Sequence, residues 1–148
     1  MPALSADEAR ARFLAARVAR QATAPATAAD YPQLVPIIFA AIDADTLVCC
    51  FDRPPGTRAA RTHLEHLGTG PRMSLIVDEY TEDWSTLWWA RADVRVSLLD
   101  PDRSEERPAR DAAVAALVAK YEQYRDAPPE GPATQMTVER WAGWSARA

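Results

Sequence analysis

A chain of 148 residues with 48% hydrophobic content has enough apolar mass for one globular domain, residues 1–148, and no room for a second. Its net charge of -4 disfavours nonspecific binding to nucleic acid, which depends on a clustered basic excess. No run of about 18 apolar residues predicts a membrane span, and the first residues lack the order of a secretory signal, so we expect a cytoplasmic protein that binds no membrane.

The first elements are a helix, a strand and a proline-interrupted loop. Ser5 and Glu8 have the spacing of a capping box, which predicts a short peripheral helix to about residue 16. From residue 17 the side chains alternate, which predicts a strand, and two prolines in segment 25–32 indicate a loop.

A β-hairpin is predicted next. Residues 34–42 form a continuous apolar run, which favours a buried strand, and residues 43–45 turn the chain into a second strand over 46–52. Pro36 lacks an N–H group, so it marks a sheet edge, a bulge, or a place where something other than a strand faces the backbone.

The adjacent Cys49 and Cys50 end this hairpin. Neighbours on a strand point to opposite faces, so they do not easily bridge each other, and we interpret both as small buried side chains. The only other soft ligands are His63 and His66, and no CxxC or HxxxH spacing exists, so we expect no metal site. The chain also lacks a serine-nucleophile motif, a P-loop and a GxGxxG loop, which disfavours hydrolase chemistry.

The junction after the hairpin has the most site-like composition in the chain. Residues 53–56 break the sheet, and Thr57 can cap a helix that carries Arg58 and Arg61. Together with Arg53 and the N-terminal N–H groups of the helix, these cations favour an anion, although an ordinary solvated basic helix face explains the pattern equally well. All but one of the 17 basic residues are arginines, which suits phosphate or carboxylate contacts, although a GC-rich coding sequence gives the same bias.

Alternation is clearest in the second half of the chain. A strand over 73–78 and an acidic turn over 79–84 lead into a long strand from residue 87, whose even positions are small or apolar and should face the core. The other face carries Trp89 and Arg91, a pair typical of ligand or subunit surfaces unless a helix covers the indole.

A second long helix is predicted from Ser104, with apolar positions at helical spacing as far as Tyr124. After a loop over 127–132, a last strand over 134–140 leads to Trp141 and Trp144, two large side chains that call for burial. Six short strands with helices inserted among them predict a mainly β (α+β) fold, a small antiparallel barrel with peripheral helices.

Five segments carry a resemblance to a known family: LVPI at 34–37, DTL at 45–47, RMSLIVD at 72–78, DWSTLWWAR at 83–91 and ERWAGWS at 139–145. Their content and order resemble the pyridoxamine-phosphate-oxidase-like, coenzyme F420-dependent proteins of actinobacteria, over nearly the whole chain. The last two segments are specific. The resemblance implies a six-stranded antiparallel split β-barrel of the FMN-binding type that forms a homodimer, with two cofactor sites in clefts between the subunits.

The same resemblance implies an oxidoreductase that transfers a hydride between a deazaflavin and a small organic substrate. Such a cofactor supplies the chemistry, which accounts for the missing nucleophile, and FMN and heme occur on related barrels. In this fold the backbone of the second strand passes along the cofactor ring, and Trp89 and Arg91 occupy the subunit interface. The implied cofactor-binding residues are Val35, Pro36, Ile37, Cys50, Phe51, Asp52, Thr57, Arg58, Arg61 and Trp89.

Two departures from the family pattern concern the cofactor. Relatives commonly have an Asp-x-Lys-Pro-Lys-x-Thr stretch, where this chain has DRPPGTR at 52–58, with Pro54 and Gly56 at the lysine positions. Two lost phosphate contacts of about 1.5–3 kcal/mol each weaken cofactor binding unless nearby arginines substitute. The proline-interrupted loop over 25–32 replaces an Asp-Gly-Arg-Pro hairpin and reshapes the mouth of the cleft.

These departures keep two alternatives open. In one, the protein has lost the redox cofactor and binds another ligand, or catalyses a cyclisation or proton transfer in specialised metabolism with Cys50, Asp52 and His63 as candidate acid–base groups. In the other, the chain is a structural or interaction protein whose exposed tryptophans only stabilise a dimer.

Overall fold

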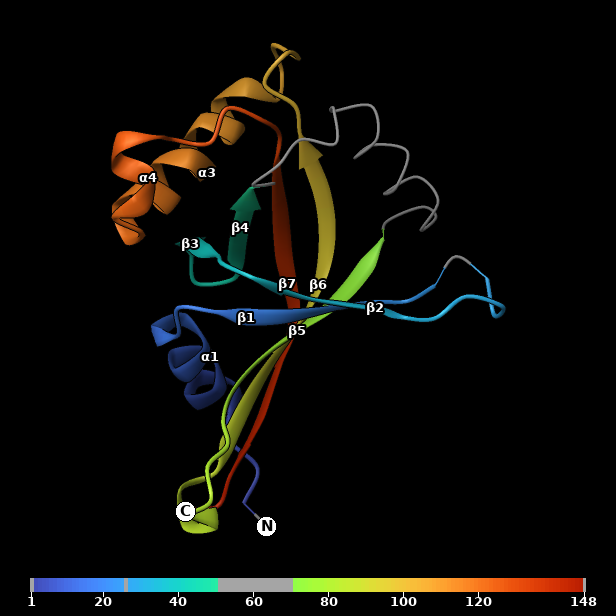
Figure 1. The fold of residues 1–148 in the computed structure, drawn as a ribbon, viewed down its shortest axis with the longest axis vertical. Helices are drawn as coiled ribbons and strands as arrows, with labels where there is room; N and C mark the ends of the chain where they lie inside the picture. Colours follow the sequence, from blue (N-terminus) through green and yellow to red (C-terminus); the bar gives the residue numbers. More distant parts are fainter. Residues whose placement is uncertain (1, 26, 51–70, 148) are drawn as a thin grey trace.

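The computed structural model describes residues 2–25, 27–50 and 71–147. The described residues form one antiparallel sheet of seven strands in the order β2-β1-β5-β6-β7-β4-β3 (Figure 1). The elements are α1 (Ala6–Ala15), β1 (Ala19–Thr23), β2 (Gln33–Ile37), β3 (Ala40–Asp43), β4 (Thr46–Cys50), β5 (Arg72–Glu79), the 3-10 helix η1 (Trp84–Thr86), β6 (Trp88–Leu99), α3 (Arg107–Lys120), α4 (Gln123–Asp126) and β7 (Ala133–Ser145).

The strand predicted over 34–42 is divided, which is why seven strands replace the expected six. The first part is β2, which pairs with β1, and the second is β3, which pairs with β4. Between them, the Phe39 N–H donates to the Tyr121 hydroxyl at 3.1 Å, and the Phe39 carbonyl lies 2.8 Å from the same hydroxyl. Because a side chain satisfies both backbone groups, the chain leaves one ladder and enters another without buried unpaired groups.

The expectation of a buried second strand is also wrong. β2 is a sheet edge with four of its five residues exposed, and Leu34 keeps 73% of its surface. The part of the apolar run that forms β2 is therefore mostly exposed to solvent. Pro36 lies on this edge strand, and a sheet edge is one of the three locations that the sequence predicts for it.

One hydrophobic cluster lies between α1 and the sheet. The capping box is confirmed, since Ser5 Oγ accepts from the Glu8 N–H at 3.2 Å and Glu8 Oε2 accepts from the Ser5 N–H at 2.7 Å. Phe13 is fully buried, with its ring centroid 5.0 Å from Phe39 and 5.4 Å from Trp141. A second cluster, which includes Leu117, lies between α3 and the other end of the sheet.

The second long helix ends earlier than its apolar spacing predicts. α3 stops at Lys120, Tyr121 is extended, and Tyr124 lies in the separate α4. With this extended backbone, the Tyr121 hydroxyl lies 2.7 Å from the Arg17 carbonyl oxygen and 2.8 Å from the Phe39 carbonyl oxygen. Tertiary hydrogen bonds thus outweigh helical propensity at this position.

The last strand runs beyond residue 140, to Ser145, and buries part of the tryptophan segment. The Trp141 indole N–H donates to Asp45 Oδ1 at 2.8 Å, and this bond lowers the pKa of Asp45 below its usual value. Gly143 lets the N-terminal segment approach, because a Cβ there would lie 2.8 Å from the Trp89 carbonyl and 2.9 Å from the Leu4 side chain. Figure 1 shows both termini at this end of the sheet.

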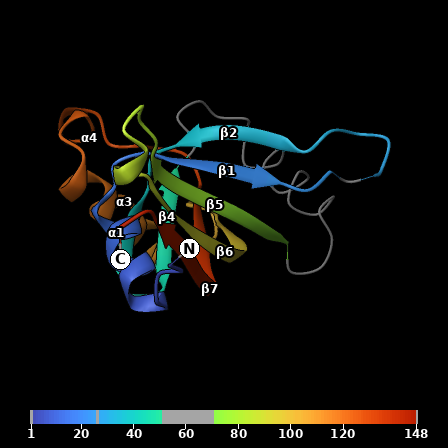
Figure 2. The ribbon, with the colours of Figure 1, turned by 90° about the horizontal axis from the view of Figure 1, so that it is seen from below.

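The predicted alternation of the long strand is confirmed, since the even positions 90–98 of β6 are all buried. The α-helices of the described residues, α1, α3 and α4, lie on one side of the molecule, and the β1–β2 hairpin projects toward the other (Figure 2). Within the described ranges, no helix is long and apolar enough to cross a membrane.

Candidate functional site

The candidate site lies on the face of the sheet opposite α1, which we call the outer face. Antiparallel register aligns side chains from neighbouring strands there. One row contains Pro36, Arg20, Ile76 and Arg91, and the next contains Leu34, Ala22, Ser74 and Asp93. Charged and polar side chains thus come together from β1, β5 and β6.

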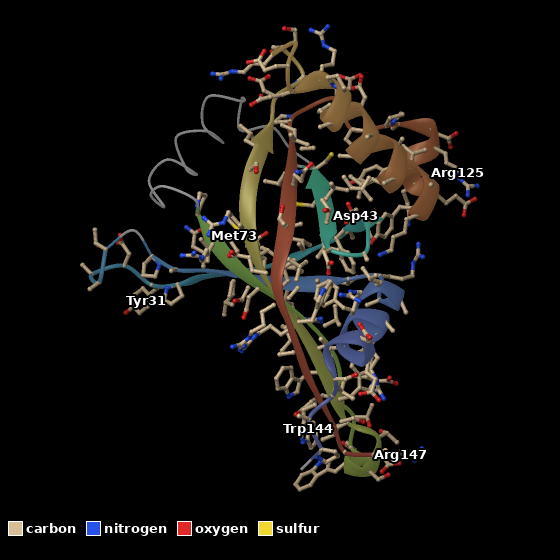
Figure 3. All side chains as sticks on the ribbon, turned by 180° about the vertical axis from the view of Figure 1, so that it is seen from behind. Tyr31, Asp43, Met73, Arg125, Trp144 and Arg147 are labelled. Atoms are coloured by element: carbon tan, nitrogen blue, oxygen red, sulfur yellow. The ribbon has the colours of Figure 1, made fainter. Side chains whose placement is uncertain are left out.

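A groove of about 550 Å³ opens at this part of the sheet. Its volume lies within the range of small-molecule sites. Residues from β1, β5, β6, β7 and the β1–β2 loop line it: Ala22, Thr23, Ala24, Pro32, Arg72, Met73, Ser74, Arg91, Asp93, Val94 and Glu139. Figure 3 shows Met73 near the point where the hairpin that carries Tyr31 leaves the sheet.

Asp93 is the first of two carboxylates that organise the groove. Its Oδ1 accepts a 2.8 Å hydrogen bond from the Ser74 hydroxyl and lies 3.2 Å from Arg91 Nε. Its Oδ2 lies 3.3 Å from Arg140 Nε. One carboxylate thereby contacts two guanidinium groups.

Glu139 repeats this arrangement on β7. Arg72 Nε donates to its Oε1 at 3.2 Å, and Arg95 Nη2 donates to its Oε2 at 3.2 Å. These two hydrogen bonds hold the pKa of Glu139 below its ordinary value of 4.5, so the carboxylate is charged at neutral pH. Four guanidinium groups therefore share two carboxylates, and the cluster retains net positive charge.

The structure places the sequence-predicted residues on different faces. Pro36 and Trp89 lie on the outer face, and Trp89 stands opposite Trp144 of β7. Val35 and Ile37 have the other orientation on β2, where Ile37 packs against the α1 cluster and Val35 is exposed. Cys50 packs against the α3 cluster. The remaining predicted residues, Phe51, Asp52, Thr57, Arg58 and Arg61, lie outside the described residues.

Of the groove residues, the sequence singles out Arg91, which with Trp89 is typical of a ligand or subunit surface, but it does not predict the groove as a site. Arg72 and Ser74 alternate on β5, and Asp93 follows Arg91 at the same spacing on β6, so each strand separately marks a polar face. What the sequence does not provide is the register, which brings Arg72 to Glu139 across 67 residues.

The comparisons with known proteins point to one fold. No protein-family model and no curated protein matches the sequence. An FAD-binding protein from Mesorhizobium loti has 26% identity and a TM-score of 0.63, with 96% of this chain and 93% of that chain covered. A candidate pyridoxamine 5′-phosphate oxidase from Corynebacterium glutamicum has 14% identity and a TM-score of 0.58, with 96% and 90% covered. The heme storage protein HutZ from Vibrio cholerae has 14% identity and a TM-score of 0.59, with 94% and 90% covered.

The fold class is therefore confirmed in its broader form. The chain has a mainly β fold with an antiparallel sheet and few helices, and it matches split-barrel proteins of the pyridoxamine 5′-phosphate oxidase type. Its structural neighbours include flavin-binding and heme-binding proteins.

Proposed function

We propose that this chain is a flavin-type oxidoreductase: a homodimer that binds a flavin or deazaflavin and transfers a hydride between it and a small organic substrate. The observation that carries this proposal is the fold shared with an FAD-binding protein over 96% of the chain at 26% identity. The sequence favours coenzyme F420 among such cofactors, and this neighbour favours FAD. We also propose that the protein is cytoplasmic.

The described residues fit such a cofactor in two respects. Pro36 and the half-buried indole of Trp89 share the outer face, where they offer apolar surface to a planar ring. The neighbouring guanidinium cluster has excess positive charge, which suits an anionic cofactor or substrate.

The chain's own residues would bind and orient, while the bound cofactor would supply the hydride chemistry. In this proposal Trp89 lies along the ring, and Pro36, three strands away on β2, lies along another part of the cofactor. Thr57, Arg58 and Arg61 contact its phosphate, as the family pattern implies. Because two lysine positions of that pattern are Pro54 and Gly56, arginines must make the phosphate contacts.

Cofactor titration tests the proposal directly. The purified protein is titrated separately with FAD, FMN, F420 and heme, with absorbance and fluorescence as readouts. We expect saturable binding of a flavin or of F420. Trp89→Ala should weaken it by at least about tenfold, since stacking surface is lost, and Trp84→Ala, a change at a tryptophan that is 78% exposed on η1, should not. Absence of binding by any flavin or F420 would contradict the proposal.

The homodimer is tested independently. Trp89 and Trp144 are opposite each other on the outer face and only partly buried, and Trp144 Nε1 has no hydrogen-bond partner within the described residues. A second protomer would cover this apolar surface. Size-exclusion chromatography with light scattering should give twice the 16.3 kDa chain mass, and a clean monomer would exclude a cleft between subunits.

A second candidate is a split-barrel protein that has lost its redox cofactor and uses the cleft for another ligand or a non-redox step. The observation in its favour is the loss of both family lysines at Pro54 and Gly56. A stable dimer that binds none of the four cofactors would favour it over the oxidoreductase.

A further inference from the structure

The groove on the outer face contains carboxylates whose acceptor positions are already in use. Each oxygen of Asp93 and Glu139 lies within 3.3 Å of a guanidinium nitrogen, and Asp93 Oδ1 also accepts from Ser74. A cation entering the groove would have to displace an arginine. The carboxylates therefore serve as internal partners that hold the guanidinium groups in place.

The guanidinium groups, in contrast, have donors left over. Arg72 and Arg95 each donate a single N–H to Glu139 within the described residues, although a guanidinium group carries five. Arg91 donates to Asp93 Oδ2 through Nη2 at 3.5 Å, while its buried Nε lies 3.2 Å from Asp93 Oδ1 without forming a hydrogen bond. Unused donors and net positive charge coincide at one groove.

We propose that this groove is an oxyanion site that binds the phosphate or carboxylate group of the organic substrate, so that the substrate is a small anion. Guanidinium groups bind both oxyanions through paired N–H donors, and here their orientation is fixed before the ligand arrives. The groove of about 550 Å³ also has room for the rest of a small molecule. The identification of the bound anion as the substrate rests on the proposed function. The oxyanion site itself rests only on the geometry of the groove.

Inorganic pyrophosphate and succinate are the probes, observed by calorimetry and by the arginine Nε–H signals in ¹H–¹⁵N NMR spectra. We expect saturable binding of at least one probe with a dissociation constant below about 1 mM. The Arg72 Nε–H signal should shift, because the exposed guanidinium group of Arg72 gains an acceptor. Arg72→Gln and Arg91→Gln should each weaken binding by about tenfold or more.

Arg125→Gln is the matched control, since Arg125 is exposed on α4, away from the sheet face that forms the groove (Figure 3). It should leave probe binding unchanged. Circular dichroism checks that the variants fold, and the exposed Arg72 side chain makes its loss easy to tolerate. Absence of binding by either probe, or binding that neither groove variant weakens, would overturn the proposal.

Flavin titrations distinguish an oxyanion that belongs to the substrate from the phosphates of the cofactor. If the groove serves the substrate, Arg72→Gln leaves the affinities for FAD and riboflavin unchanged. If this variant weakens FAD but not riboflavin, the groove holds the cofactor's phosphates, and the substrate assignment is wrong. Probe binding without binding of any flavin or F420 would retain the oxyanion site and remove the oxidoreductase proposal.

Discussion

Two groups of cationic side chains in this molecule use their charge in opposite ways. The first group is Arg17 and Lys120, which together with Phe39 and Tyr121 form what we call the α1–α3 junction. Arg17 Nη2 donates to the Lys120 carbonyl at 2.9 Å, and Lys120 Nζ donates to the Ala16 carbonyl at 2.8 Å. The two cations thus join the end of α1 to the end of α3 through backbone oxygens.

Aromatic rings complete the junction. Lys120 Nζ lies 3.8 Å from the centre of the Phe39 ring, and Arg17 lies 5.0 Å from that of Tyr121. Burial and the nearby Arg17 lower the pKa of Lys120 to about 8. In the outer-face groove, guanidinium groups pair with carboxylates at a solvent-accessible surface, and Arg72 and Arg95 keep donors that no described residue uses.

The contrast shows that a basic residue marks a ligand site only when its donors remain accessible and partly unused. The chain's single lysine has a lowered pKa, and a perturbed pKa often indicates a functional residue. Its contacts show instead that this lysine helps to pack the ends of two helices together. The arginines of the groove, in contrast, are arranged to receive an anion. Substitutions should therefore affect stability at the junction and binding at the groove.

The largest effect on stability should come from Phe39→Ala. The ring is fully buried against Phe13 and Lys120, so its removal leaves a cavity and should lower the free energy of unfolding by about 3–5 kcal/mol. Urea denaturation measures this loss. Leu34→Ala, at a side chain that is 73% exposed, is the matched control and should change it little. A loss below about 1 kcal/mol would mean that Phe39 is not part of the core.

Tyr121→Phe should have the next largest effect. The hydroxyl accepts from the Phe39 N–H and shares its one proton between the carbonyls of Phe39 and Arg17. Removal leaves these backbone groups without their partner and should cost about 1–3 kcal/mol in urea denaturation. Tyr31→Phe, at a tyrosine that is 89% exposed, should cost nothing measurable. Equal stabilities of the two variants would show that water replaces the Tyr121 hydroxyl.

The junction also shows how far the sequence predicts the fold. The capping box at Ser5 and Glu8 and the alternation of β6 depend on residues a few positions apart, and the structure confirms both. The break at Phe39 depends on Tyr121, 82 residues away. A continuous apolar run contains no local sign of such a break, so one strand was predicted where two exist.

Two residues in the segments that carry the family resemblance have clear structural roles. Asp83 caps η1 by accepting from the N–H of Ser85 at 3.1 Å, and Gly143 permits close backbone packing. Because the fold requires such residues, their presence in the sequence indicates the fold. The groove could not be predicted in the same way, because its ion pairs join residues as far apart as Arg72 and Glu139, whose pairing depends on strand register.

A pH-dependent effect should follow from Lys120. Its folded pKa, about 8, lies below the ordinary 10.5, so the unfolded state binds more protons between these values and stability rises with pH. The raised pKa of Tyr121 acts oppositely, above its ordinary value of 10.0, so pH 8 to 10 is the useful window. We expect a rise on the order of 1 kcal/mol after allowance for solvent screening. Lys120→Met should abolish this slope, and a wild-type stability that is flat or falling from pH 8 to 10 would contradict the assignment.

The smallest expected effect, from Glu139→Gln, separates binding from stability most sharply. Neutralising Glu139 removes one of the two carboxylates and frees the N–H groups of Arg72 and Arg95, so pyrophosphate affinity should rise roughly threefold. The urea midpoint at pH 7 should hardly move, because the ion pairs are exposed. The lowered pKa of Glu139 adds stability that is present above the ordinary 4.5 and lost as the pH falls through the folded value, so the variant should also be less sensitive to acid.

Glu130→Gln, at an exposed loop carboxylate, controls for the change in overall charge. If both variants raise the affinity equally, the effect comes from net charge and the groove has no special role. If Glu139→Gln instead lowers the affinity as far as Arg72→Gln, the orienting effect of the carboxylate outweighs its competition for the arginine donors. Because neither substitution touches the α1–α3 junction, a difference in binding between the two variants reports on the groove.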